Sequence, residues 1–161
     1  MRSCLSFLQH RLQIGLLGSL PSTLLLITVS AVLTCCSYWV NMKSMGITKP
    51  GQAPKTYSQS GIPVFLDCGS SIANLPTFLV NQILADFPGA TYLPEPQIYQ
   101  IDCSFATQDG TVNFGFGDII FNVPYSEFIM QQSSNFCYLG TRINDEISSL
   151  GGVFSSSLYV S

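Results

Sequence analysis

The residue best placed to do chemistry is Asp67, which ends an apolar run in the stretch VFLDCGSS, Val64 to Ser71. A carboxylate seated in a catalytic loop can act as a general acid or base. Asp and Gly are also common where a strand enters an ordinary turn, so a purely conformational role is the competing interpretation. The sequence around Asp67 must decide between the catalytic and the conformational interpretation.

Several other kinds of chemistry are excluded by composition and spacing. The single histidine, His10, lies near the start of the chain, which removes His-dependent triads and most metal sites that use histidine. Cys68, Cys103 and Cys137 are too widely spaced for a local metal knuckle, and the stretch GFGD lacks the spacing of a nucleotide-binding loop. We therefore predict no metal and no cofactor.

The charge of the chain excludes a nucleic-acid partner and disorder. The net charge is −3, and no patch of Lys and Arg is present. Only 9% of the residues are charged and 47% are hydrophobic, and 161 residues are enough for one domain with a core.

Residues 1–36 differ from the rest and predict an apolar leader with an N-terminal helix. Residues 14–36 reach the roughly 20 apolar residues needed to cross a bilayer, and Arg2 and Arg11 precede them. A membrane anchor and a secretory signal peptide fit about equally, although Pro21 interrupts the run. A third interpretation is a poorly defined chain start.

The part from residue 37 to residue 161 is predicted to be mainly β. Tyr38 to Ile47 is strand-like, and the polar Pro/Gly stretch TKPGQAPKTYSQSG is predicted to be a turn that returns the chain to a strand from Ile62 to Leu66. The best helix is LPTFLVNQILADFPG, with Pro76 in its first turn and Pro88 at its end. Strands follow, with Asp109-Gly110 predicted as a hairpin turn and GFGD as another turn.

The order of these motifs resembles the carboxy-terminal lobe of a pepsin-like aspartic protease (peptidase A1). The resemblance covers about Tyr38 to Val160 and rests on VFLDCGSS, NLPTFLVNQI, YQIDCS, VNFGFGDIIFNVPYSEFI, CYLG and LGGVFSSSLYV taken in sequence. It implies a single lobe of the bilobal pepsin-like fold, with one or two short helices.

The resemblance also implies roles for particular residues. Asp67 matches one of the two catalytic aspartates, and Gly69 and Ser70 match positions that contact the substrate backbone. Cys103 and Cys137 match a disulfide, although two separate buried thiols remain an alternative. Leu150-Gly151 incompletely resembles a segment that threads beside the catalytic loop. Two departures are Cys68, where the family has a hydroxyl, and Gly152, where relatives carry Asp.

The function implied is that of an aspartic endopeptidase family member. Two carboxylates sharing one proton activate the attacking water, and this chain supplies one candidate, Asp67. We therefore expect the chain by itself to be inactive and to need a complementary amino-terminal lobe or a second copy. The substrate would be a peptide or protein, and residues 14–36 could contact a membrane.

Two other functions stay open on sequence alone. One is a non-catalytic β module, secreted or membrane-anchored, that binds peptides through a half-cleft, which would account for Cys68 and Gly152. The other is an inactive gene fragment. The disulfide and the leader both predict a secreted or membrane-anchored, extracytoplasmic protein.

Overall fold

A computed structural model describes residues 38–155, with the exception of residues 59 and 68. This part of the chain is mainly β, as predicted, and its strands form three sheets. The predicted leader, residues 1–36, lies outside the described residues. No helix within the described part is both long enough and apolar enough to cross a bilayer.

The first sheet carries the Asp67 loop. Its strand order is β1 (Tyr38–Met42), β4 (Ile62–Leu66), β13 (Ser149–Leu150), β5 (Ala73–Leu75) and β12 (Thr141–Ile143). β1 and β4 are antiparallel, whereas β13 runs parallel to β4 and antiparallel to β5. A late segment of the chain thus lies between the strands that precede and follow Asp67.

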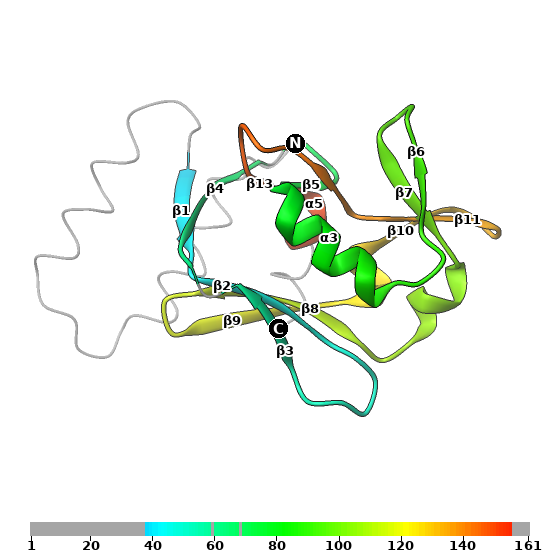
Figure 1. Ribbon diagram of the computed structural model, residues 1–161, viewed down its shortest axis with the longest axis horizontal. Coiled ribbons are helices and arrows are strands. Elements are labelled where there is room, and N and C mark those ends of the chain that lie inside the picture. Colours follow the sequence, from blue (N-terminus) through cyan, green and yellow to red (C-terminus); the bar gives the residue numbers. More distant parts are fainter. Residues whose placement is uncertain (1–37, 59, 68, 156–161) are drawn as a thin grey trace, which may run out of the picture. The chain divides into compact units, whose positions relative to one another are not determined.

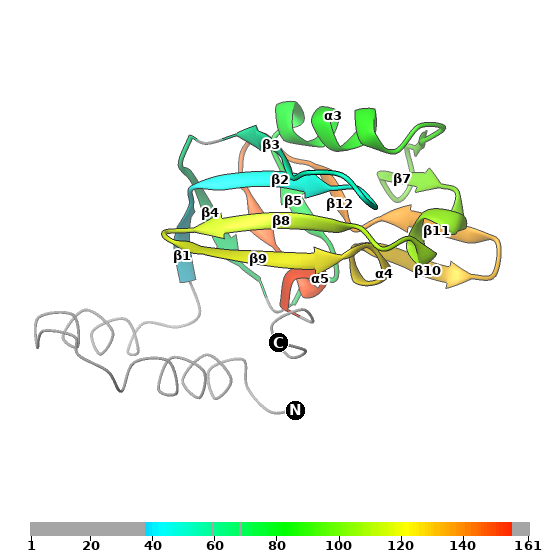
Figure 2. The same ribbon diagram turned by 90° about the horizontal axis from the view of Figure 1, so that it is seen from below.

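The second sheet shows that the predicted turn after Ile47 was partly wrong. Its order is β3 (Lys55–Ser58), β2 (Ser44–Thr48), β8 (Thr111–Phe116) and β9 (Ile119–Pro124). The predicted first strand is in fact two strands, β1 and β2, and β3 lies inside the predicted polar turn, paired with β2. Figure 2 shows these four strands side by side.

The turn predictions around β8 had opposite outcomes. GFGD does form the turn between β8 and β9, where Gly117 has a φ of 62°, a conformation that glycine adopts without steric cost. Asp109-Gly110 is not a hairpin turn, because a 3-10 helix, η1 (Cys103–Thr107), precedes it and β8 pairs with β2 and β9.

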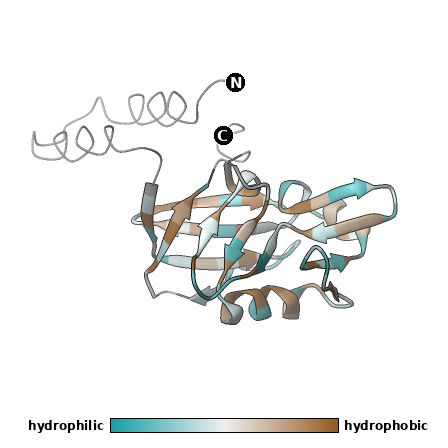
Figure 3. Cartoon of the chain, turned by 90° about the horizontal axis from the view of Figure 1, so that it is seen from above, coloured by the Kyte–Doolittle hydropathy of each residue, from teal (hydrophilic) through white to brown (hydrophobic). Residues whose placement is uncertain are grey.

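The third sheet lies at the end of the body opposite β1 (Figure 1). Its order is β10 (Ile129–Ser133), β11 (Phe136–Leu139), β7 (Ile98–Ile101) and β6 (Thr91–Leu93). A disulfide joins Cys103 to Cys137 and so ties η1 to β11. In Figure 3 hydrophilic colours gather at the hairpin farthest from β1.

The predicted helix is present as α3 (Thr77–Asp86). It begins directly after Pro76, whose fixed φ suits a helix start, and it buries Leu79, Val80 and Ile83. Phe87, just beyond its end, is 1% exposed and packs edge-on against Phe105 of η1. α3 lies beside β3, at one edge of the second sheet (Figure 2).

Two short helices close the core. α4 (Tyr125–Phe128) buries Tyr125 and Phe128, and α5 (Gly152–Ser155) places Phe154 against three aromatic rings of the second sheet. The ring centroids of Phe114, Phe116 and Phe121 lie 5.6, 5.6 and 5.4 Å from that of Phe154. Since α5 directly follows β13, this packing anchors the segment that threads past Asp67.

Candidate active site

Asp67 is the first residue after β4, and its backbone is hydrogen-bonded to β13, the strand that lies between β4 and β5. Its N–H donates to the carbonyl oxygen of Leu150 over 2.9 Å, which continues the parallel pairing of β4 with β13. Two residues earlier, the N–H of Phe65 donates to the carbonyl of Ser148 over 2.9 Å. β13 therefore fixes the point at which the chain leaves the sheet.

The side chain of Asp67 folds back on its own loop. Its Oδ1 accepts a hydrogen bond of 2.8 Å from the N–H of Gly69, an Asx-type turn. Among the described residues, no hydrogen bond or ion pair engages the second carboxylate oxygen. One oxygen therefore orients the carboxylate and the other can meet a ligand or a second acid.

Residues 69–72 are clamped by the segment that follows β13. The N–H of Gly152 donates to the Ser70 carbonyl over 2.7 Å, and the N–H of Val153 donates to the Ser71 carbonyl over 3.1 Å. The Ser70 hydroxyl donates to the Ile72 carbonyl over 2.8 Å. The loop is thus held mainly by backbone hydrogen bonds.

Gly151 makes the crossing of the two segments possible. A Cβ on Gly151 would lie 2.7 Å from the Ser70 carbonyl oxygen and closer still to that of Ile72. Real Cβ atoms do not approach backbone oxygens so closely, so only glycine fits between these two carbonyls. The partial match of Leu150-Gly151 to the threading segment is confirmed by this geometry.

A buried polar row lies beside the loop, and sequence reasoning missed it. Asn74 on β5 donates from Nδ2 to the Ser149 hydroxyl over 2.7 Å, and Arg142 on β12 donates from Nε to Asn74 Oδ1 over 2.6 Å. Asn74 and Ser149 are 9% and 4% exposed. Their separation of 75 residues leaves no local signal in the sequence.

The predicted site residues fall into two places. Asp67, Gly69 and Ser70 share one loop, whereas Cys103 and Cys137 form their disulfide in the region of η1 and β11. Cys68 lies outside the described residues. Within the described part of the chain, no group of three or more His, Cys, Asp or Glu side chains is arranged to hold a metal ion.

A second acid, Asp86, has a quite different environment. It ends α3 and is 7% exposed, and its two oxygens accept from Lys49, Lys55 and Tyr57, each over 2.8 Å. Burial alone would raise the pKa of Asp86, but the hydrogen bonds from these three side chains outweigh it and hold the pKa below its ordinary value. This carboxylate stays ionised and fully occupied, so its role is to join α3 to β3 and the turn before it.

Comparison with known proteins agrees with this geometry. The family model described as eukaryotic aspartyl protease matches residues 23–161, so the match begins within the predicted leader. Barrierpepsin from Saccharomyces cerevisiae is 37% identical over 109 residues, which are 66% of this chain and 18% of that protein.

Two further relatives show the same partial coverage. Aspartic proteinase 3 from Saccharomyces cerevisiae is 31% identical over 75% of this chain and 21% of its own length. Candidapepsin-2 from Candida parapsilosis is 34% identical over 66% of this chain and 25% of its own length. This chain therefore spans about a fifth to a quarter of the relatives that it matches. The extent of the family match shows that the chain belongs to the eukaryotic aspartyl protease family.

Proposed function

We propose that this chain supplies one of the two catalytic carboxylates of an aspartic endopeptidase, and that this carboxylate is Asp67. The observation that supports the proposal best is the difference in hydrogen bonding between its two carboxylate oxygens. Oδ1 is oriented by the Gly69 N–H, and the other oxygen has no partner among the described residues. A carboxylate used only to close a turn would not need the second segment, 149–153, to clamp its loop.

The proposed reaction is hydrolysis of a peptide bond by an activated water. When two carboxylates lie close enough to share one proton, the ionised one takes a proton from the water and the protonated one polarises the peptide carbonyl. The proton belongs to the pair, so activity should be highest in acid and fall towards neutral pH. Asp67 alone cannot hold both protonation states at once.

Gly69 and Ser70 are proposed to contact the backbone of a peptide or protein substrate. The Ser70 hydroxyl already donates to Ile72 and its carbonyl accepts from Gly152. Among the described residues nothing engages the Ser70 backbone N–H, a donor, and the Ser70 hydroxyl oxygen can still accept. Both groups suit an extended peptide, whose own backbone alternates acceptors and donors.

The second carboxylate is proposed to come from outside residues 38–155. A complementary amino-terminal lobe or a second copy of the chain would each bring an aspartate to face Asp67. The coverage of only 18% to 25% of the relatives in the comparison leaves ample length for such a lobe in the proteins of this family. On this proposal a single copy of the chain has no proteolytic activity.

We also propose that residues 1–36 are a signal peptide or membrane anchor and that residues 37–161 form the lobe. The disulfide between Cys103 and Cys137 supports an extracytoplasmic location, because disulfides persist in oxidising compartments. The apolar run at residues 14–36 supports entry into such a compartment.

The test is cleavage of an unfolded protein at acidic pH, measured with the full chain alone and with an aspartic protease amino-terminal lobe that carries its own catalytic aspartate. We expect cleavage only in the mixture or at high chain concentration, and we expect pepstatin to block it. Asp67→Asn should lower the rate by about 10² to 10⁴-fold, the usual contribution of a positioned acid or base.

Asp109→Asn is the matched control, because Asp109 is an exposed acid that also lies near a glycine. Cleavage that survives Asp67→Asn, or that falls equally in both variants, would refute the role of Asp67. Absence of Asp67-dependent cleavage in every arm would also count against the proposal.

A further inference from the structure

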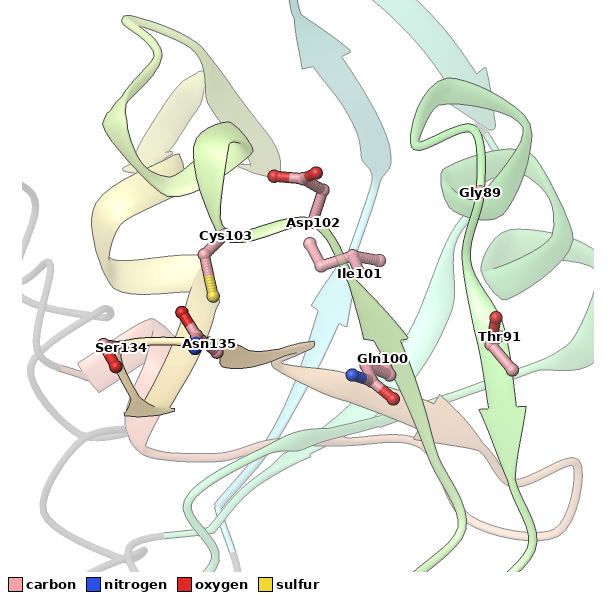
Figure 4. A pocket seen from close by; sticks show the side chains of 8 residues that line it. All are labelled: Gly89, Thr91, Gln100, Ile101, Asp102, Cys103, Ser134 and Asn135. Carbon is pink, nitrogen blue, oxygen red and sulfur yellow. The ribbon is translucent and has the colours of Figure 1, made fainter.

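A pocket of about 600 Å³ lies at the end of the body that carries the third sheet, and Asp67 is not among its lining residues. Figure 4 shows that its side chains come from three segments: Thr91 on β6, Gln100 and Ile101 on β7, and Ser134 and Asn135 in the turn between β10 and β11. Its volume falls in the range of small-molecule sites, about 300–1,000 Å³.

The pocket walls are rich in groups that both donate and accept hydrogen bonds. Gln100 and Asn135 contribute carboxamides, and Thr91 and Ser134 contribute hydroxyls. None of these four side chains hydrogen-bonds to another residue in the part of the chain that the structure describes. Their hydrogen-bonding capacity is therefore available to a ligand.

The charge of the pocket restricts what can bind. None of the lining residues is Lys, Arg or His, and the one ionisable side chain is Asp102. Hydrogen bonds from Ser104 hold the pKa of Asp102 below its ordinary value, so the group is ionised and repels anions. A cation would be attracted only weakly, because a single exposed carboxylate is screened by water.

The pocket is held in shape by the disulfide and by strand pairing. Cys103 is part of the lining, and its partner Cys137 lies two residues after Asn135. Cys137 is also paired with Ile101 across β11 and β7. The polar side chains on β7 and those in the turn before β11 are thereby kept in a fixed relation, which lowers the cost of ordering them around a ligand.

We propose that this pocket binds a neutral, hydroxyl-rich ligand of the carbohydrate class. A sugar hydroxyl donates and accepts at the same time, so it can use both halves of a carboxamide and both functions of a hydroxyl. A guanidinium or ammonium group only donates, and it would leave the amide N–H groups of Gln100 and Asn135 unused. Ile101 is 5% exposed and packs in the core, so the pocket offers a ligand mainly polar groups.

The test is an NMR titration of the ¹⁵N-labelled full chain with maltose and with cellobiose. N-acetyl-arginine amide and inorganic phosphate serve as cationic and anionic comparison probes. We expect at least one disaccharide to shift the amide signals of residues 100–103 and 134–135 with millimolar affinity, and we expect neither charged probe to do so. Reduction of the disulfide should abolish these shifts.

Variants separate the proposed ligand from a cation. Gln100→Ala and Asn135→Ala should each weaken disaccharide binding about fivefold, the loss of one hydrogen bond. The matched control is Gln82→Ala, at an exposed glutamine on α3, which should change nothing. Asp102→Asn keeps an acceptor for the Ser104 N–H and should alter disaccharide binding less than about twofold.

Three results would overturn the proposal. The first is the absence of shifts at residues 100–103 and 134–135 with both disaccharides. The second is disaccharide binding that neither Gln100→Ala nor Asn135→Ala weakens. The third is preferential binding of the arginine derivative with loss in Asp102→Asn, which would make the pocket a cation site. None of these results depends on Asp67 or on proteolysis.

Discussion

Asp67 directly follows an apolar strand and Asp86 ends an apolar helix, yet the hydrogen-bond partners of the two carboxylates are of opposite kinds. Asp67 follows β4, and its side chain accepts one hydrogen bond, from the backbone N–H of Gly69. Asp86 ends α3 and accepts from two lysines and a tyrosine, all at 2.8 Å. The first is positioned by the main chain and, within the part of the chain that the structure describes, has one oxygen without a partner, whereas both oxygens of the second accept from side chains.

This difference shows how one fold can use one carboxylate for stability, Asp86, and leave another, Asp67, for a reaction. A carboxylate between two cations is a poor proton acceptor, and its neighbours respond to its charge: burial and the hydrogen bond to Asp86 raise the pKa of Tyr57. Burial, with the charge of Asp86, also raises the pKa of Tyr125, to about 12. Among the described residues no such cluster of partners surrounds Asp67, which leaves room for a second acid beside it.

The largest expected effect is the loss of stability in Asp86→Asn. Removing the charge weakens the hydrogen bonds that Asp86 accepts from Lys49, Lys55 and Tyr57. Because the two lysine side chains are 34% and 52% exposed, water compensates part of the loss, and we expect a cost of roughly 2–3 kcal/mol, the value of hydrogen bonds to one charged group. Asp67→Asn should change the free energy of unfolding by less than about 0.5 kcal/mol, because Asn can still accept from Gly69. Urea unfolding of both variants measures this difference in the free energy of unfolding. Equal losses in the two variants would contradict the prediction.

Asp86 also predicts how the free energy of unfolding depends on pH, with a definite sign. The folded-state pKa of Asp86 lies below its ordinary value of 3.8, so its contribution is present above that pH and is lost as pH falls through the folded-state value. Unfolding free energy should therefore drop below about pH 4, and more steeply in the parent than in Asp86→Asn. If Asp86→Asn kept the full pH dependence of the unfolding free energy, other titrating groups would be its cause.

The next effect tests whether main chain positions Asp67. Gly151→Ala places a methyl group against the backbone oxygens of Ser70 and Ile72, which forces the threading segment away from the loop. We expect a loss of about 2 kcal/mol in unfolding free energy and the loss of any Asp67-dependent cleavage. The matched control is Gly152→Ala, whose Cβ would lie 3.4 Å from the nearest atom, an ordinary contact. Equal tolerance of both substitutions would contradict the clamp.

The contrast between the two acids also explains what the sequence could predict. Asp67 and α3 were found because their signals are local: an apolar run before Asp-x-Gly-Ser, and apolar positions three and four residues apart between two prolines. The Asp86 cluster draws on residues 49, 55, 57 and 86, which meet only once β3 pairs with β2. β3 itself was missed because its Pro/Gly surroundings favour a turn, and only pairing with a distant strand makes it extended.

A smaller effect concerns an acid that resembles Asp67 in accepting from backbone. Asp145 accepts from the Thr77 N–H and hydroxyl, each over 2.7 Å, and so satisfies a free N–H at the start of α3. Asp145→Ala should lower the melting temperature, because the Thr77 N–H then loses its capping partner. Thermal unfolding of this variant beside Glu146→Ala, a neighbouring exposed acid, isolates the cap. A null result would mean that backbone-bound carboxylates here contribute nothing to stability.

The smallest effect should run in the opposite direction, towards greater stability. The Thr141 hydroxyl on β12 is fully buried and has no hydrogen-bond partner among the described residues. Burying an unpaired hydroxyl is unfavourable, and valine has nearly the same shape, so Thr141→Val should raise the free energy of unfolding by up to about 1 kcal/mol. Thr141→Ser keeps the hydroxyl, loses a methyl group and should destabilise. If Thr141→Val destabilised instead, the hydroxyl would have a hydrogen-bond partner in the folded protein, and the stabilising effect predicted here would be refuted.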